Sequence, residues 1–250
     1  MSFFNIFLKL QNNNNFLYKN NPKVLEVGCG NGNDVRNFIE GGLNIIGIDV
    51  EFKQGPHIEK LIKEKRILPI EVNAIRKDVG NTNTKYIWPI EDESMDFIIS
   101  SSVIEHVANM KDFAKESQRT LRDGGYIVHY YPSRFSLIEA HVGIPFGGVL
   151  RNRSYIRLMH TLGLCKRKFR ARKFTDILEY LENFTFYRQD KELIDIFCKS
   201  GFTFVSIDSK SIIEVKALRL RFFSKLPFFN YLFKLLRSKV LIMQKKKIEI

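Results

Sequence analysis

The sequence is poor in cysteine and proline, with 3 Cys and 7 Pro among 250 residues. Cys29, Cys165 and Cys198 lack the paired spacing of a disulfide scaffold or of a zinc ribbon. Such scarcity suits a reducing compartment. We therefore expect no disulfide framework and no metal site.

The sequence also lacks a long, uncharged apolar run. Its most apolar window, residues 222–243, is interrupted by four basic residues and by Pro227, so we expect no segment that crosses a bilayer. The first apolar stretch, residues 3–10, has neither the basic region nor the cleavage site of a signal peptide. We expect a cytoplasmic protein, either soluble throughout or held peripherally at the inner face of the membrane.

Two segments contain no acidic residue at all. Residues 151–173 have nine basic side chains, and residues 216–247 have ten. The whole chain has 40 basic and 27 acidic residues and a formal net charge of +13, so the rest of the chain is net acidic. This contrast predicts that the two segments meet an anionic partner, although a solvated charged face would give the same pattern.

Apolar patterning predicts an α/β fold. With 44% hydrophobic residues the chain can build a substantial core, which excludes a disordered or low-complexity protein. Short apolar runs alternate with helical periodicity between residues 22 and 132, which is typical of a mostly parallel, doubly wound sheet. The expected strands are residues 24–27, 44–50, 68–72, 95–101, 126–131, 202–207 and 240–244. The expected helices between them are residues 34–39, 58–65, 110–121 and 191–199.

The same patterning divides the chain into an N-terminal arm, residues 1–21, and a single domain, residues 22–250. The alternation stops after Pro132, and residues 133–188 contain loops followed by two amphipathic helices. A second insertion, about residues 209–238, contains basic amphipathic helices. Insertions of this length are usually functional, and we expect the first to form a lid over an acceptor.

The strongest local motif is a glycine-rich turn between a strand and a helix. Three glycines occur in Val24-Leu-Glu-Val-Gly-Cys-Gly-Asn-Gly32, and Asp49 ends the next strand. Glycines allow a sharp turn and let a ligand approach bare backbone, and an acid about twenty residues further on can accept hydrogen bonds from ribose hydroxyls. Glu26 would repel a pyrophosphate but suits a cofactor with an amino group and a sulfonium. This combination favours S-adenosylmethionine (SAM) over a dinucleotide.

Further segments follow the glycine turn in a fixed order. They are Trp88-Pro-Ile-Glu-Asp-Glu-Ser-Met-Asp-Phe97, Ile104-Glu-His-Val107 and Leu121-Arg-Asp-Gly-Gly-Tyr126. Together with Leu25-Glu-Val-Gly-Cys-Gly-Asn-Gly32 and Asp49, they resemble class I SAM-dependent methyltransferases of the type 11 kind over roughly residues 22–132. The resemblance implies a Rossmann-like class I methyltransferase fold, with a mostly parallel seven-stranded sheet and helical insertions after strands five and six.

The resemblance also implies a set of cofactor contacts. Gly28 and Gly30 would face the methionine part of SAM, Asp49 would hold its ribose, and Asp78 is the candidate contact for its adenine. The complete implied cofactor site is Glu26, Gly28, Cys29, Gly30, Asp49, Val50, Asp78, Ser101 and Ser102.

Three side chains are candidates for catalysis. An oxygen nucleophile benefits from a general base near the transferred methyl group, and open parallel sheets bind ligands at the carboxyl edge of their strands. His106 follows the fourth strand, and Glu139 and His141 lie in the first insertion. For His106 the alternative is a helix-capping or core role.

Residues 131–146 resemble methyltransferases found with bacterial surface-polysaccharide genes. This resemblance implies O-methylation of a small-molecule or glycan acceptor, such as a sugar, a sugar nucleotide or a phosphorylated precursor. The basic segment 151–173 would then hold the anionic group of that acceptor.

Two alternatives stay open. One is an RNA methyltransferase whose basic segments bind phosphates. The other is a non-catalytic protein of the same fold whose residues 216–247 lie on an anionic membrane surface. We expect no DNA binding, because the fourth strand ends in Ser100-Ser-Ser-Val103 and not in the Asn/Asp-Pro-Pro-aromatic turn of adenine and cytosine amino-methyltransferases.

Overall fold

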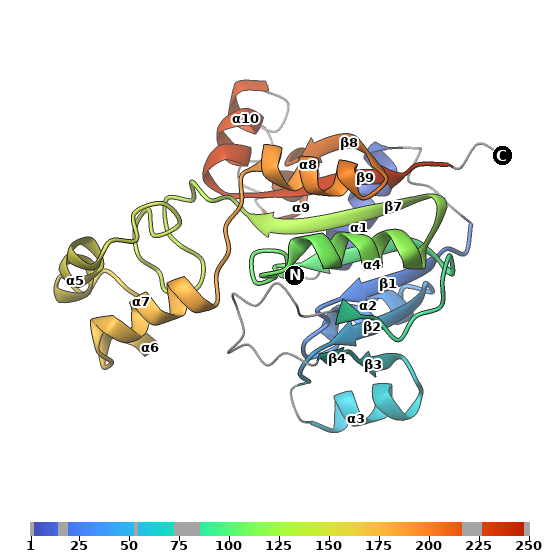
Figure 1. The fold of residues 1–250 in the computed structure, drawn as a ribbon, viewed down its shortest axis with the longest axis horizontal. Coiled ribbons are helices and arrows are strands. Elements are labelled where there is room, and N and C mark those ends of the chain that lie inside the picture. The colour runs from blue at the N-terminus through green and yellow to red at the C-terminus, as the bar shows by residue number, and fades with distance from the viewer. Residues whose placement is uncertain (1–2, 15–19, 53–54, 73–85, 217–226, 248–250) are drawn as a thin grey trace.

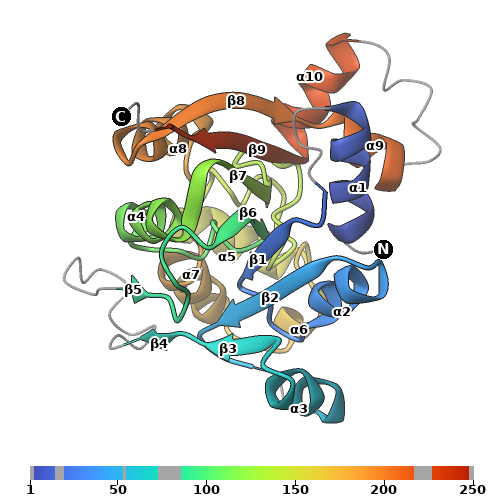
Figure 2. The same ribbon diagram turned by 90° about the vertical axis from the view of Figure 1, so that its right-hand side faces the viewer.

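A seven-stranded sheet forms the centre of the molecule, and the computed structural model describes residues 3–14, 20–52, 55–72, 86–216 and 227–247. The strands of this sheet are β1 (Lys23–Val27), β2 (Asn44–Asp49), β3 (Ile67–Pro69), β6 (Met95–Ser101), β7 (Leu121–Pro132), β8 (Phe202–Asp208) and β9 (Ser238–Lys245). Their order across the sheet is β3–β2–β1–β6–β7–β9–β8 (Figures 1 and 2). The first five strands pair in parallel, and β9 runs antiparallel to both β7 and β8. This arrangement agrees with the predicted fold class.

Helices cover both faces of the sheet. The helices that pack on the sheet or connect its strands are α1 (Phe3–Asn13), α2 (Asn33–Glu40), α3 (Pro56–Lys63), α4 (Met110–Thr120), α8 (Asp190–Lys199), α9 (Lys210–Lys216) and α10 (Pro227–Leu236). Figure 2 shows α4 and α8 on one side of the sheet and α1, α2 and α9 on the other. Each side has its own apolar core, because strand side chains alternate between the two faces.

The N-terminal segment that the sequence predicted as an amphipathic arm forms α1. Its apolar face is buried and lies on the same side of the sheet as α2. The Phe7 ring makes edge contacts with Phe97 of β6 at 5.4 Å between ring centroids and also packs against Phe38 of α2. This helix therefore completes one of the two cores of the sheet.

Two predicted strand boundaries and one predicted number of helices are wrong. The fifth strand of the sheet begins at Leu121 rather than Tyr126, because a shift in its register with β6 accommodates the glycine pair that suggested a turn. The predicted strand at residues 68–72 is divided between β3 and β4 (Glu71–Val72), which pairs outside the sheet with β5 (Tyr86–Ile87). The insertion after β7 contains three helices, not two.

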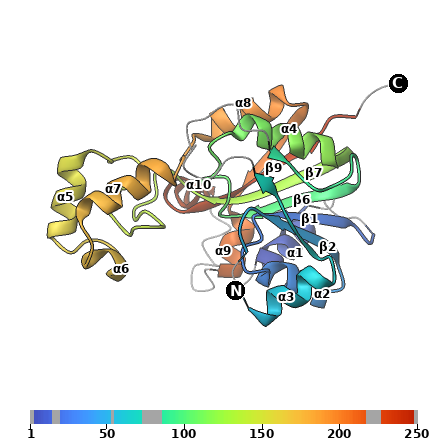
Figure 3. The ribbon, with the colours of Figure 1, turned by 60° about the horizontal axis from the view of Figure 1, so that its bottom comes forward.

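Residues 133–188 form an insertion lobe beyond the end of β7 (Figures 1 and 3). Its helices are α5 (Arg153–Thr161), α6 (Arg167–Arg170) and α7 (Phe174–Asn183). The lobe has a small core of its own, separate from the two cores of the sheet. That core consists of Val142, Ile144, Ile156, Cys165, Phe169, Ile177 and Leu181.

The helix α10 differs from the others in having no buried residue. Phe228 is 77% exposed and Tyr231 is 61% exposed. Among the described residues, no helix has the length and apolar character needed to cross a membrane.

Candidate functional site

The glycine turn after β1 is fixed by backbone contacts. Gly28 has a φ of +75°, and its N–H donates to the Ile48 carbonyl of β2 at 2.8 Å. A Cβ atom added at Gly28 would lie 2.3 Å from a methyl carbon of Val103. Both the backbone conformation and this close approach therefore require glycine.

Asp49 lies directly against this turn. Its Oδ2 accepts a hydrogen bond from the Gly30 N–H at 2.6 Å, and its Oδ1 accepts one from the Val50 N–H at 2.7 Å. The carboxylate thus joins the end of β2 to the turn that follows β1. It lies at the carboxyl edge of two adjacent parallel strands, where such sheets bind nucleosides.

Glu26 is buried beneath the same turn, with 3% of its surface exposed. Burial raises the pKa of its carboxyl group well above the usual value, and the nearby Asp34 and Asp49 carboxylates raise it further. Among the described residues, its Oε2 has no hydrogen-bond partner. A buried carboxyl oxygen without a partner, close to two other acids, fits a ligand that brings a positive charge or N–H donors. The residues present therefore fit the amino acid part of SAM.

Other predicted cofactor residues surround this centre. Cys29 is buried, and burial, followed by the charges of Glu26 and Asp49, raises the pKa of its thiol. This agrees with a packing role and does not suit a nucleophile. Val50 is 46% exposed beside Asp49. Asp78 lies outside the described residues.

The end of β6 brings the chain past the glycine turn. Ser101 is its last residue, and Ser102 has a φ of +58° with its N–H donating to the Tyr130 carbonyl at 2.8 Å. The next residue, Val103, packs against Gly28. The segment that follows, with Glu105 and His106, therefore begins beside the predicted cofactor turn.

A second group of polar side chains gathers after β6. We call it the Glu105 cluster, and it consists of Glu105, His106, Glu139, His141 and Tyr187. The rings of His106 and His141 meet edge to face at 4.5 Å between centroids. The Nε2 atom of His141 lies 3.9 Å from Oε1 of Glu105. The structure thus brings together all three predicted catalytic residues.

Hydrogen bonds hold the members of this cluster in place. Glu139 accepts from the backbone N–H of His141 at 2.9 Å through Oε2 and from the Tyr187 hydroxyl at 2.6 Å through Oε1. The His106 Nδ1 atom lies 2.5 Å from the Phe184 carbonyl. A carbonyl only accepts, so Nδ1 of His106 carries the proton.

Burial controls protonation within the cluster. Burial raises the pKa of Glu105 to about 8, and the charge of Glu139 adds to this effect. Burial lowers the pKa of His141 to about 4, against the opposing effect of Glu139. At neutral pH the His141 imidazole is therefore uncharged, as a proton acceptor or metal ligand must be.

Sequence reasoning missed Glu105 and Tyr187. Glu105 stands next to His106 in Ile104-Glu-His-Val107, and its side chain is only 1% exposed. Tyr187 is more than 80 residues further along the chain, and no local pattern links it to this motif. Adjacency to a candidate histidine was the one available signal for Glu105.

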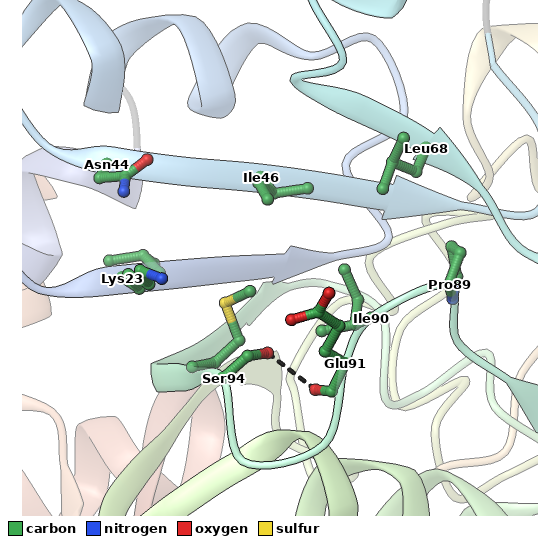
Figure 4. Close-up of a pocket in the computed structure, with 10 residues that line it drawn as sticks. Lys23, Asn44, Ile46, Leu68, Pro89, Ile90, Glu91 and Ser94 are labelled. Atoms are coloured by element: carbon green, nitrogen blue, oxygen red, sulfur yellow. Dashed lines mark hydrogen bonds between the residues drawn. The ribbon is translucent and has the colours of Figure 1, made fainter.

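A well-formed hollow among the described residues lies elsewhere. It has a volume of about 300 Å³, and Lys23, Asn44, Pro89 and Glu91 are among its lining residues (Figure 4). Lys23 and Asn44 are the first residues of β1 and β2, whereas the glycine turn and Asp49 lie at the opposite ends of these strands. This hollow is therefore separate from the candidate site.

The basic segment 151–173 covers the lobe. Eight of its nine basic side chains are exposed. The exception is Arg151, which donates to the Leu181 and Thr185 carbonyls at 2.8 and 3.0 Å. Arg151 thus serves the lobe's own structure, and the other eight remain accessible to an anionic ligand.

A parallel sheet with a glycine turn after β1 and an acid at the end of β2 defines a Rossmann-like nucleoside-binding fold. Comparisons with known proteins identify the family within this class. Residues 7–207 match the family described as a methyltransferase domain. The chain therefore belongs to this family, and the predictions of a methyltransferase fold and of SAM as cofactor are confirmed at that level.

Individual relatives match part of the chain. A probable SAM-dependent methyltransferase of Mycolicibacterium smegmatis is 27% identical over 113 residues, which are 45% of this chain and 39% of that protein. The ubiquinone biosynthesis O-methyltransferase of Pelagibacter ubique is 27% identical over 105 residues, or 42% of this chain and 40% of the relative. The matches thus span about two fifths of each relative's own length.

A solved structure supports the fold. Haemonchus contortus phosphoethanolamine N-methyltransferase 2, in complex with S-adenosyl-L-methionine, superimposes with a TM-score of 0.56 at 14% identity. The superposition covers 98% of this chain and 53% of the other. At this identity the likeness concerns the fold alone.

Proposed function

We propose that the protein is a SAM-dependent methyltransferase that methylates an oxygen of a small-molecule or glycan acceptor. One observation carries this proposal: Val103 packs against Gly28 of the cofactor turn, and the Glu105 cluster begins two residues later. A cofactor at the turn and an acceptor at the cluster would therefore be neighbours. Such proximity is the main requirement of an in-line transfer.

Each end of this site has a distinct task in the proposed reaction. Bound SAM supplies an electrophilic methyl group. Asp49 would accept hydrogen bonds from the ribose hydroxyls, and the unpartnered Glu26 oxygen would accept one from the amino group. His141, uncharged at neutral pH, would accept the proton of the acceptor hydroxyl.

The lobe supports an acceptor with an anionic group. Its eight exposed basic side chains lie on the same insertion as Glu139 and His141. Arginine and lysine bind phosphate strongly, so a sugar nucleotide or phosphorylated sugar of a surface polysaccharide suits this site. The O-methyltransferase from Pelagibacter ubique is a relative with oxygen chemistry.

The test is a screen for methyl transfer from labelled SAM. Nucleotide-activated sugars, phosphorylated sugars and total RNA would be offered to the purified protein, with Asp49→Ala as the inactive control. We expect transfer to a sugar-containing acceptor that is lost in the control. Absence of SAM binding in calorimetry would contradict the proposal, and transfer to RNA alone would favour the RNA methyltransferase, which the exposed basic lobe also suits.

A peripheral membrane contact through residues 216–247 is a second proposal, and it rests on α10. This helix carries Phe228 and Tyr231 on its exposed surface, and its segment is rich in basic residues. Co-sedimentation with anionic vesicles would test it, with the double substitution Phe228→Ser and Tyr231→Ser as the comparison. Equal sedimentation of both proteins would contradict this contact. The cytoplasmic location stays a prediction.

A further inference from the structure

Glu105 is a buried acid whose carboxyl oxygens accept no hydrogen bond from the described residues. Its side chain is 1% exposed. A buried carboxyl group without a partner is costly in its charged form, so in that form it pairs with a cation or coordinates a metal.

Two histidines converge on this carboxylate. One potential ligand atom from each of Glu105, His106 and His141 lies within 4.8 Å of the other two. Ligand atoms about 2.1 Å from a metal lie up to about 4.2 Å apart, so a small inward movement of these side chains would complete a site. The 3.9 Å separation between His141 Nε2 and Glu105 Oε1 already falls within this range.

Neighbouring groups orient the two histidines in the way that is common in metal sites. The Nδ1–H of His106 donates to the Phe184 carbonyl, and metal-binding histidines commonly fix their ring by such a bond. The Nε2 atom of His141 has no partner among the described residues. Glu139 is engaged by the backbone N–H of His141 and by the Tyr187 hydroxyl, so it supports the loop instead of supplying a ligand.

We propose that Glu105, His106 and His141 bind a divalent first-row cation such as Zn²⁺, Mn²⁺ or Fe²⁺. Two imidazoles and one carboxylate suit these metals better than Mg²⁺ or Ca²⁺, which prefer oxygen ligands. Three protein ligands leave coordination positions open. This adds a metal site to a chain whose sequence predicted none.

The open positions suggest the class of acceptor, a point that rests on the proposed function. Two adjacent positions on a cation fit two neighbouring oxygens, such as the vicinal diol of a sugar. Because Val103 places the cluster beside the glycine turn, a diol held there would lie close to the cofactor. In the metal-bound protein His141 would be a ligand and not the base. The cation would orient the acceptor hydroxyl and lower its pKa, so that the proton passes to solvent.

Metal binding can be tested without SAM or acceptor. Tag-free full-length protein, stripped with EDTA, would be dialysed against Zn²⁺ or Mn²⁺, and the bound metal measured by elemental analysis. Visible absorption after adding Co²⁺ would report the ligand geometry. We expect one cation per chain, and at least tenfold weaker binding in Glu105→Gln and in His141→Ala.

His160→Ala is the matched control. His160 lies in α5 of the same lobe, and its Nε2 also lacks a partner among the described residues. This variant should bind the cation like the wild type. Absence of stoichiometric binding to the wild type, or unchanged affinity in a folded Glu105→Gln protein, would overturn the proposal. SAM titration of the metal-free protein separates this outcome from failure of the methyltransferase proposal.

Discussion

The two ends of the candidate site are built in different ways. The predicted cofactor turn is held through its main-chain N–H groups: Gly28 donates to the Ile48 carbonyl, and Gly30 donates to the Asp49 carboxylate. The Glu105 cluster is held by side chains from separate parts of the chain, with Tyr187 binding Glu139 across 48 residues. The first end depends on local geometry, and the second depends on how the lobe docks against the sheet.

The apolar cores of the sheet and of the lobe also differ. The sheet separates two large apolar cores, whereas the lobe has one small core around Ile156 and Ile177. A lobe with its own core can change its surface without disturbing the sheet. This separation predicts that substitutions will affect either cofactor binding or acceptor chemistry, and seldom both.

The first prediction has the largest expected effect. It concerns SAM binding at the glycine turn. Asp49→Ala removes the acceptor that holds Gly30 and, by our proposal, the ribose hydroxyls. Hydrogen bonds to a charged group contribute about 1.5–3 kcal/mol each, so we expect roughly a 1000-fold loss of SAM affinity. Calorimetric titration measures this directly.

The Asp49→Ala protein should still fold, because Asp49 is not part of an apolar core. Its unfolding temperature should fall moderately, because the N–H groups of Gly30 and Val50 lose their acceptor. Glu40→Ala, at the exposed end of α2, is a control that should bind SAM normally. Wild-type affinity in Asp49→Ala would contradict the assignment of the ribose site.

The second prediction concerns the acceptor end. His141→Ala should lower turnover by a few hundred-fold, within the usual range for loss of a general base. The affinity for SAM should change less than twofold, since His141 belongs to the lobe. Steady-state kinetics together with SAM titration would test this, with His160→Ala as control. Equal losses in turnover and SAM affinity would break the separation between the two ends.

The sequence predicted the cofactor end better than the acceptor end. The glycine turn and Asp49 were predictable because their chemistry is local to two strands and a loop. Glu105 and Tyr187 were not predictable as one site. They are far apart in the chain, and only the docking of the lobe against the sheet brings them together. The early start of β7 at Leu121 was missed since Gly124 and Gly125 resemble a turn, although the register shift keeps them within the strand.

The third prediction tests whether the lobe is independent. Ile156 is fully buried in the lobe core, and Ile156→Ala should destabilise the lobe by about 2 kcal/mol, at the low end for such changes because a small core can partly collapse. Hydrogen exchange of amides in residues 142–181 should accelerate while the sheet stays protected. Leu158→Ala, on the exposed side of the same helix, is the matched control. Faster exchange throughout the sheet would show that the two regions unfold as one.

The fourth prediction has the smallest expected effect. It concerns the pH dependence of the protein's stability that is caused by a buried histidine. His129 of β7 is fully buried, its Nδ1 lies 2.8 Å from the Ser100 hydroxyl, and burial lowers its pKa to about 3. The unfolded chain binds this proton below about pH 6.5, and the folded protein does not. Stability should therefore fall as the pH falls from 6.5 towards 3, by about 1.4 kcal/mol per pH unit from this residue.

His129→Asn should remove this part of the pH dependence while keeping a polar partner for Ser100. The measurement is the free energy of unfolding in urea at pH 6 and pH 5, for the wild type and the variant. The difference between the two pH values should be about 1.4 kcal/mol smaller in the variant. Parallel curves would mean that His129 takes up a proton inside the folded sheet, which would require water or an anionic partner to reach this buried strand.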